Sequence, residues 1–172
     1  MSDSKTLFIA AVVVATLAAA STDVRSRRIP NWLTVPIFVL GLLYHTLVGG
    51  LAGLGNSLAG FAVGLGLLLV PWLLGGGGAG DVKLMAAVGA WFGPKLTLFV
   101  WIASLGFALV MALAVLAYMG LTRGMSHVQK QYLGQNEGTP AVPRVATRKR
   151  VVPYAVPVAL GSWMVLAYMA WH

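Results

Sequence analysis

The chain has 172 residues, of which 59% are hydrophobic and 9% are charged. A soluble globular domain carries about 25% charged residues, so this composition argues against that class. Long apolar stretches recur from Leu7 to Trp171, and a helix that crosses a bilayer needs roughly 20 apolar residues. These stretches do not alternate polar and apolar residues as barrel strands do. The sequence therefore predicts an all-α, polytopic membrane protein.

The net charge of +8 comes mainly from basic residues in two connecting segments. Such residues act as topology signals and contact lipid headgroups, so we expect membrane lipids as partners and no nucleic acid. The chain has no cysteine, and His45, His127 and His172 lack the spacing of metal ligands. We therefore expect no metal site, no disulfide and no cofactor.

Six apolar segments are expected to cross the membrane as a helix bundle. Glycine, proline and polar residues separate them, with Gly49-Gly50 and Gly93-Pro94 marking two of the breaks. No internal repeat is present, so we expect a single membrane-embedded domain, residues 1–172, with a basic loop at about 121–152. The expected spans are residues 6–22, 32–48, 54–74, 82–92, 96–120 and 154–171.

If all six segments cross, the basic residues divide unevenly between the two membrane faces. One face holds ten lysines and arginines, and the other holds only Lys5 and Lys95. The positive-inside rule then predicts that the ten-residue face is cytoplasmic and that both termini are external. The fourth segment has 13 residues, Asp81 to Gly93, or about 20 Å of helix, whereas the hydrocarbon core measures roughly 30 Å. We therefore expect Asp81 below the membrane surface, shielded by protein or in a water-filled recess.

Four side-chain carboxylates occur in the chain, on Asp3, Asp23, Asp81 and Glu137. Asp23 and Asp81 each lie where an expected span meets the basic face. An acidic residue at membrane depth is costly and indicates a function. Two carboxylates held close together share a proton, so one can activate water while the other protonates a leaving group. The pattern indicates an aspartyl pair without assigning the two roles.

Structural roles compete with this interpretation. Asp23 can form an ion pair with Arg25, Arg27 or Arg28, and Asp81 can cap the helix that follows it. Against these roles, Asp23 follows the expected end of a helix, where the helix dipole disfavours a negative charge. Asp81 follows a run of glycines whose entropic cost a simple cap does not require.

Two motifs around these acids resemble those of the type IV prepilin peptidases, a family of membrane aspartyl proteases. The family's GxGD signature is similar to Gly78-Ala79-Gly80-Asp81, which Lys83 follows two residues later. An aspartate that closes the first helix before a basic stretch and Ile-Pro-Asn resembles the segment 23–31. For Lys83, an influence on the local field, a contact with substrate and a cation reaching the membrane interface all remain open.

A third motif, residues 152–161, is similar to the element that opens the family's last helix. It contains Pro153-Tyr154, but Ala155 stands where family members often have glycine. The resemblance is closest to the short Flp or Tad-pilus form, so it implies peptidase activity without the methyltransferase domain of longer relatives. It implies catalysis by Asp23 and Asp81. Independently of the resemblance, the glycines from Gly75 to Gly80 suit a close backbone approach or a gate, and a flexible connector is the alternative.

The same resemblance implies a prepilin or pseudopilin as substrate, cleaved after its leader at the cytoplasmic face of a bacterial inner membrane. Two alternatives come from other classes of protein. One is a small proton-coupled transporter or channel whose acids form a relay. The other is a non-catalytic subunit of a pilus-assembly machine. The pairs Gly49/Gly53 and Gly60/Gly64 predict close helix packing within the bundle and, as a lesser expectation, a homo-oligomer.

Overall fold

The computed structural model describes residues 2–75, 78–123 and 153–171. All regular structure within these ranges is helical, which confirms the predicted all-α class. Residues 121–123 of the expected loop extend a helix, and residues 124–152 lie outside the described part of the chain. The helices are α1 (Ser2–Ser26), α2 (Asn31–Leu73), α3 (Ala79–Arg123) and α5 (Ala155–Trp171).

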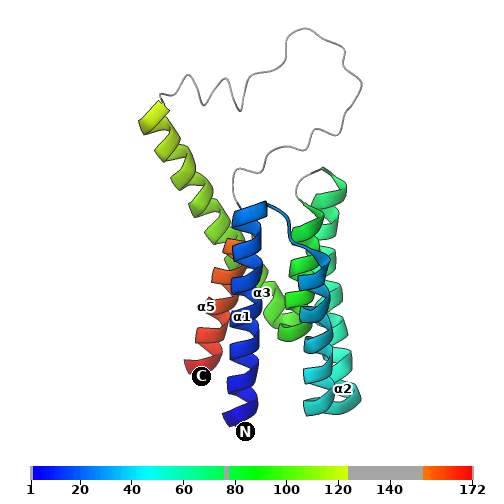
Figure 1. Ribbon diagram of the computed structural model, residues 1–172. Coiled ribbons are helices and arrows are strands. Elements are labelled where there is room, and N and C mark those ends of the chain that lie inside the picture. The colour runs from blue at the N-terminus through cyan, green and yellow to red at the C-terminus, as the bar shows by residue number, and fades with distance from the viewer. Residues whose placement is uncertain (1, 76–77, 124–152, 172) are drawn as a thin grey trace. The chain divides into compact units, whose positions relative to one another are not determined.

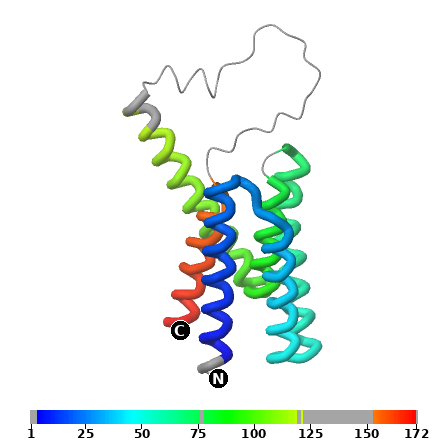
Figure 2. Tube along the Cα trace, viewed as in Figure 1, coloured from blue at the N-terminus to red at the C-terminus, as the bar shows by residue number. Residues whose placement is uncertain are grey.

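The helices α2 and α3 each contain one glycine at which the chain reverses direction (Figures 1 and 2). Gly50 has φ 58° and Gly93 has φ 71°, values that glycine adopts at no steric cost. Both predicted breaks are therefore confirmed, and each helix consists of two antiparallel legs. The legs are residues 31–49 and 51–73 of α2, and residues 79–92 and 94–107 of α3, whose second leg continues along the chain to Arg123.

The chain divides into two compact units. The first comprises Met1–Phe107 and Pro153–His172, and the second comprises Ala108–Val152. In the second unit, the described residues 108–123 are the last part of α3. Three helices in the described ranges are long and apolar enough to cross a membrane, and the apolar α5 is shorter. The chain is thus a multi-pass membrane protein by length and composition. Six crossings, one for each leg, remain a prediction.

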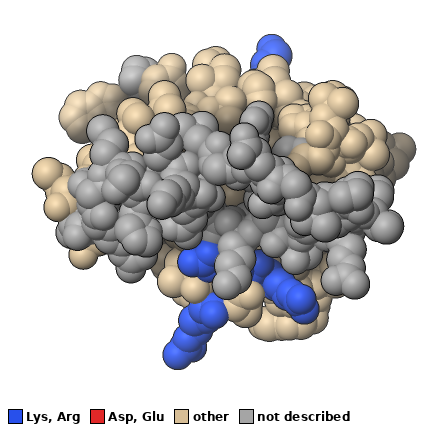
Figure 3. Space-filling model, turned by 90° about the horizontal axis from the view of Figure 1, so that it is seen from above, with Lys and Arg blue, Asp and Glu red and all other residues tan. Residues whose placement is uncertain are grey.

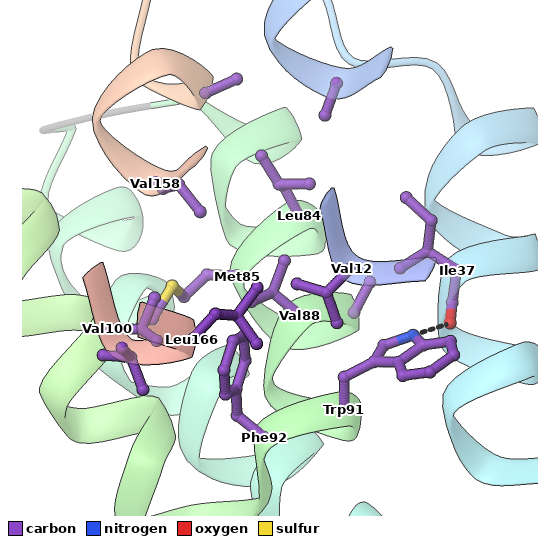
Figure 4. Close-up of a cluster of buried hydrophobic side chains, with 14 of the residues drawn as sticks. Val12, Ile37, Leu84, Met85, Val88, Trp91, Phe92, Val100, Val158 and Leu166 are labelled. Atoms are coloured by element: carbon purple, nitrogen blue, oxygen red, sulfur yellow. Dashed lines mark hydrogen bonds between the residues drawn. The ribbon is translucent and has the colours of Figure 1, made fainter. Parts of the chain in front are cut away.

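The first leg of α3 forms the centre of the first unit. Every residue from 84 to 93 is buried, as expected for a helix that other helices surround. Because other helices surround residues 84–93, the backbone of this part of the leg is shielded by protein, and its short length needs no thinning of the bilayer. Its core side chains meet residues from α1, α2, the second leg of α3 and α5 (Figure 4); the labelled ones are Val12, Ile37, Leu84, Met85, Val88, Trp91, Phe92, Val100, Val158 and Leu166.

Glycines allow α2 to approach this central leg closely. A Cβ atom added to Gly60 would collide with the carbonyl oxygen of Gly89, and one added to Gly64 would collide with that of Met85. Small residues permit such backbone contacts between membrane helices. The predicted packing role is confirmed for the Gly60/Gly64 pair. In the Gly49/Gly53 pair, a Cβ atom at Gly53 would collide with the carbonyl oxygen of His45, whereas nothing lies near a Cβ atom at Gly49.

Candidate active site

Asp23 is buried at the junction of α1 and α5. The helix α1 ends at Ser26, four residues beyond the predicted end of the first span, so Asp23 lies within its last turn. Its side chain is 1% exposed. The carboxylate oxygen Oδ2 accepts a hydrogen bond of 3.0 Å from the backbone N–H of Ala155. Oδ1 is buried and has no hydrogen-bond partner among the described residues.

The structural role considered for Asp23 was an ion pair, and this interpretation is wrong. Arg25, Arg27 and Arg28 are exposed while Asp23 is buried, and its carboxylate joins no ion pair within the described ranges. Seen from above, basic side chains project from the described surface and no acidic one is visible there (Figure 3). A buried carboxylate oxygen without a partner is costly and calls for a functional explanation.

Asp81 is the third residue of α3, so the predicted role as the N-cap residue is also wrong. Its backbone N–H donates to the carbonyl oxygen of Gly78 at 3.0 Å, and its side chain is 6% exposed. A carboxylate in the first turn of a helix is favoured by the helix dipole. Residue 80, the second glycine of the signature, precedes it directly. The prediction that Asp81 is shielded by protein fits this burial.

Asp81 lines a cavity of about 220 Å³ at the end of the first unit where α3 begins. The walls are mostly apolar and aromatic, and among the described lining residues Asp81 alone has an ionisable acidic or basic side chain apart from the phenol of Tyr154. This combination suits an apolar segment of polypeptide placed beside an acid. We call it the aspartate cavity; its lining residues are Leu68, Pro71, Trp72, Gly78, Asp81, Val82, Trp101, Leu105 and Tyr154.

Tyr154 and Ala155 connect the two aspartates through consecutive residues. Tyr154 lines the aspartate cavity, and the next N–H, that of Ala155, is bonded to Asp23. The Tyr154 hydroxyl lies 3.1 Å from Oγ of Ser104. Because the Ser104 hydroxyl donates its proton to the carbonyl oxygen of residue 101 at 2.7 Å, the tyrosine is the donor in this bond. In the third motif, Tyr154 therefore lines the cavity of Asp81 and Ala155 binds Asp23. The hydrogen bond to Ser104 holds Tyr154 against α3.

The first two motifs also contact each other directly. A Cβ atom on Gly80 would lie 3.3 Å from Cβ of Ile29, so the absence of a side chain permits this approach. The ammonium group of Lys83 donates a 2.9 Å hydrogen bond to Oδ1 of Asn31. Lys83 is exposed and does not line the aspartate cavity. Of the candidate site residues, Gly78, Asp81 and Tyr154 thus line the cavity, while Gly80 packs against Ile29 and Lys83 lies apart from the cavity.

Several residues at this site escaped the sequence interpretation. Ser104 has a detectable signal, since it is the only hydroxyl residue between Thr97 and Tyr118. The tryptophans are mostly near the expected span ends, which is typical of a membrane-interface belt. Trp91 instead lies in the core, where it is 5% exposed and donates its indole N–H to the carbonyl oxygen of Ile37 at 2.7 Å (Figure 4).

The chain is similar in sequence to known proteins. The sequence model of the type IV leader peptidase family matches residues 10–120, a range that contains both aspartates. A prepilin leader peptidase/N-methyltransferase of Escherichia coli (strain K12) is 35% identical over 105 residues, covering 55% of this chain and 46% of that protein.

Proteins of the same description from two other bacteria match most of the chain. The one from Aeromonas hydrophila is 28% identical over 162 residues, and the one from Stutzerimonas stutzeri is 30% identical over 159 residues. Each match covers 88% of this chain and 46% of the relative, so the chain spans about half the length of these curated proteins. No solved structure matches the chain significantly.

Proposed function

Because the chain belongs to the type IV leader peptidase family, we propose that it is an aspartic endopeptidase that removes leader peptides from prepilin-like proteins. The cleavage takes place at the cytoplasmic face of a bacterial inner membrane. The observation that carries this proposal is the burial of Asp23 and Asp81 around one pair of consecutive residues, Tyr154 and Ala155. Three motifs far apart in the sequence supply these residues.

The chemistry needs only the two carboxyl groups and one water molecule. In the proposed reaction, the ionised aspartate takes a proton from water as the water oxygen attacks the scissile carbonyl carbon. The protonated aspartate donates its proton to the leaving amide nitrogen, the C–N bond breaks, and the pair is left with one proton again. The hydrogen bond from Ala155 supports this scheme because it orients one oxygen of Asp23 and leaves Oδ1 available.

The aspartate cavity supports a substrate that is apolar next to the scissile bond. Its walls come from the second leg of α2, from both legs of α3 and from Tyr154. Aromatic side chains such as Trp72 and Trp101 bury large apolar groups well. A pilin-like substrate whose apolar helix lies in the bilayer would bring its end to the depth of Asp81. The glycines from residue 75 to 80 are proposed as a gate; residues 76 and 77 lie outside the described part of the chain.

Co-expression with a candidate prepilin tests this function. Leader removal is followed by gel shift and by sequencing of the new N-terminus. We expect Asp23→Asn and Asp81→Asn to abolish cleavage while both variants still insert into the membrane. The matched control is Asp3→Asn, the same change at another acid of the chain, which should cleave normally. Undiminished cleavage in either of the first two variants would end the assignment.

A further inference from the structure

A second cavity, of about 300 Å³, lies on a different face of the central leg of α3. On α3 it is lined by Lys83, Ala86 and Ala87, whereas the aspartate cavity uses Asp81 and Val82. The two cavities share no lining residue. We call this one the lysine cavity; its other walls, all from the two legs of α2, are Asn31, Thr34, Val35, Phe38, Phe61 and Leu65.

One end of the lysine cavity carries hydrogen-bond donors. The amide oxygen of Asn31 is occupied by the ammonium group of Lys83, which leaves the amide N–H₂ and the remaining ammonium protons for a ligand. Thr34 is 4% exposed, and its hydroxyl has no hydrogen-bond partner among the described residues. None of the described residues that line the cavity carries a carboxylate. Three donors and a positive charge without a counter-ion in the wall fit an anionic oxygen group such as a phosphate.

The rest of the lysine cavity is apolar. The rings of Phe38 and Phe61 lie 4.5 Å apart between their centroids and join the two legs of α2. Asn31 and Phe38 are seven residues apart on one helix leg, or about 10 Å at 1.5 Å per residue. The cavity therefore has a polar, basic end and an apolar interior within a length that matches an anionic headgroup and the start of an acyl chain.

We propose that the lysine cavity binds an anionic phospholipid. The phosphate oxygens accept hydrogen bonds from Lys83, Asn31 and Thr34, and the acyl chain lies against Phe38 and its neighbours on α2. The exposed Arg27 and Arg28 lie four and three residues before Asn31 in the chain and add to the positive charge of this segment. Basic recesses between membrane helices are known to hold lipid headgroups. The proposal does not depend on the peptidase function.

Native mass spectrometry of the full chain in detergent tests the proposal, with phosphatidylglycerol and phosphatidylcholine of identical acyl chains as probes. We expect the chain to retain phosphatidylglycerol in preference. Lys83→Met should lower this retention at least fivefold, and Lys83→Arg should preserve it. The matched control Lys95→Met removes an exposed lysine beyond Gly93 and should retain the lipid. The proposal would be overturned if the unaltered chain retained the two lipids equally. It would also be overturned if Lys83→Met retained phosphatidylglycerol as well as the unaltered chain does.

Two further arms separate the lipid from other occupants. Leu65→Trp fills the apolar part of the lysine cavity, and it should lower retention of phosphatidylglycerol while Lys83 stays intact. Glycerol phosphate, which has the head but no chain, should not displace the lipid; displacement would show a site for free phosphate instead. Displacement by the apolar helix of a prepilin would assign the cavity to substrate and would likewise contradict a lipid site.

Discussion

Asp23 accepts a hydrogen bond from the backbone N–H of Ala155 at 3.0 Å and thereby joins the first helix to the start of the last. The two residues are 132 positions apart, and both are buried. Ala155 is the first residue of α5, where a backbone N–H has no partner within the helix. The carboxylate of Asp23 supplies that partner, so the orientation of one proposed catalytic acid depends on where α5 begins.

Removing this N–H is expected to lower cleavage. Ala155→Pro deletes the donor at a helix position where proline is otherwise well tolerated. A hydrogen bond to a charged group contributes about 1.5–3 kcal/mol, so we expect a loss of roughly tenfold or more in the cleavage rate. The control Ala155→Gly keeps the N–H and should cleave close to normally. Equal rates for the proline variant and the unaltered chain would contradict a role for this bond.

Tyr154 and Ser104 are expected to act as one unit. Tyr154→Phe and Ser104→Ala each remove the 3.1 Å hydrogen bond between the two hydroxyls. We expect each change to lower the free energy of unfolding by about 1 kcal/mol, with Ser104→Ala costing more because Ser104 also donates to the carbonyl oxygen of Trp101. Denaturant unfolding of the single and double variants measures the coupling. Strict additivity would show that the hydroxyls do not interact.

The contact between α2 and the central leg of α3 predicts that replacing two glycines of α2 by alanine has different effects on the melting temperature. Gly60→Ala places a methyl group against the backbone of Gly89 and Gly93. We expect the melting temperature to fall, corresponding to about 1–3 kcal/mol of overpacking. Nothing lies within 4 Å of a Cβ atom at Gly66. Gly66→Ala should therefore leave the melting temperature unchanged or raise it slightly, and a fall equal to that of Gly60→Ala would refute the contact.

The approach of the first two motifs can be tested by a disulfide. The chain has no cysteine, so an engineered pair reacts without competition. Ile29→Cys with Gly80→Cys should form a bond on mild oxidation, because the Cβ separation of 3.3 Å is close to that of a disulfide. Gel mobility before and after reduction gives the measurement.

The control for this pair is Ile29→Cys with Lys95→Cys. Residue 95 lies beyond Gly93, at the far end of a leg that is about 20 Å long. This second pair should remain reduced under the same conditions. Equal cross-linking of both pairs would contradict the close approach of Ile29 and Gly80.

The sequence predicts the helices well because each boundary has a local cause. The glycines at 50 and 93 have positive φ values, and a left-handed conformation selects glycine wherever it occurs. The run of arginines before Pro30 separates α1 from α2 as expected. The end of α1 was missed by one turn, since three of the residues 23 to 26 are polar or charged and a hydropathy pattern stops before them although the helix continues.

The partners within the site have no local pattern and could not be predicted. Asp23 meets a backbone amide of α5, and a backbone donor is the same for every residue type except proline. The bond between Lys83 and Asn31 joins two polar residues that each suit an exposed position. The burial of Asp23 away from the arginines beside it follows from the arrangement of three helices and not from neighbouring residues.

The rate of leader removal by purified, reconstituted protein, compared for Asp23→Asn, Asp81→Asn and the double variant, tests the proposed acid pair most directly. If the two carboxyl groups act as one unit, each single change lowers the rate by a factor on the order of 10³, and the double variant is no slower than the slower single variant. Independent roles would instead multiply the two losses. Normal cleavage by either single variant, or a multiplied loss in the double variant, would contradict the account.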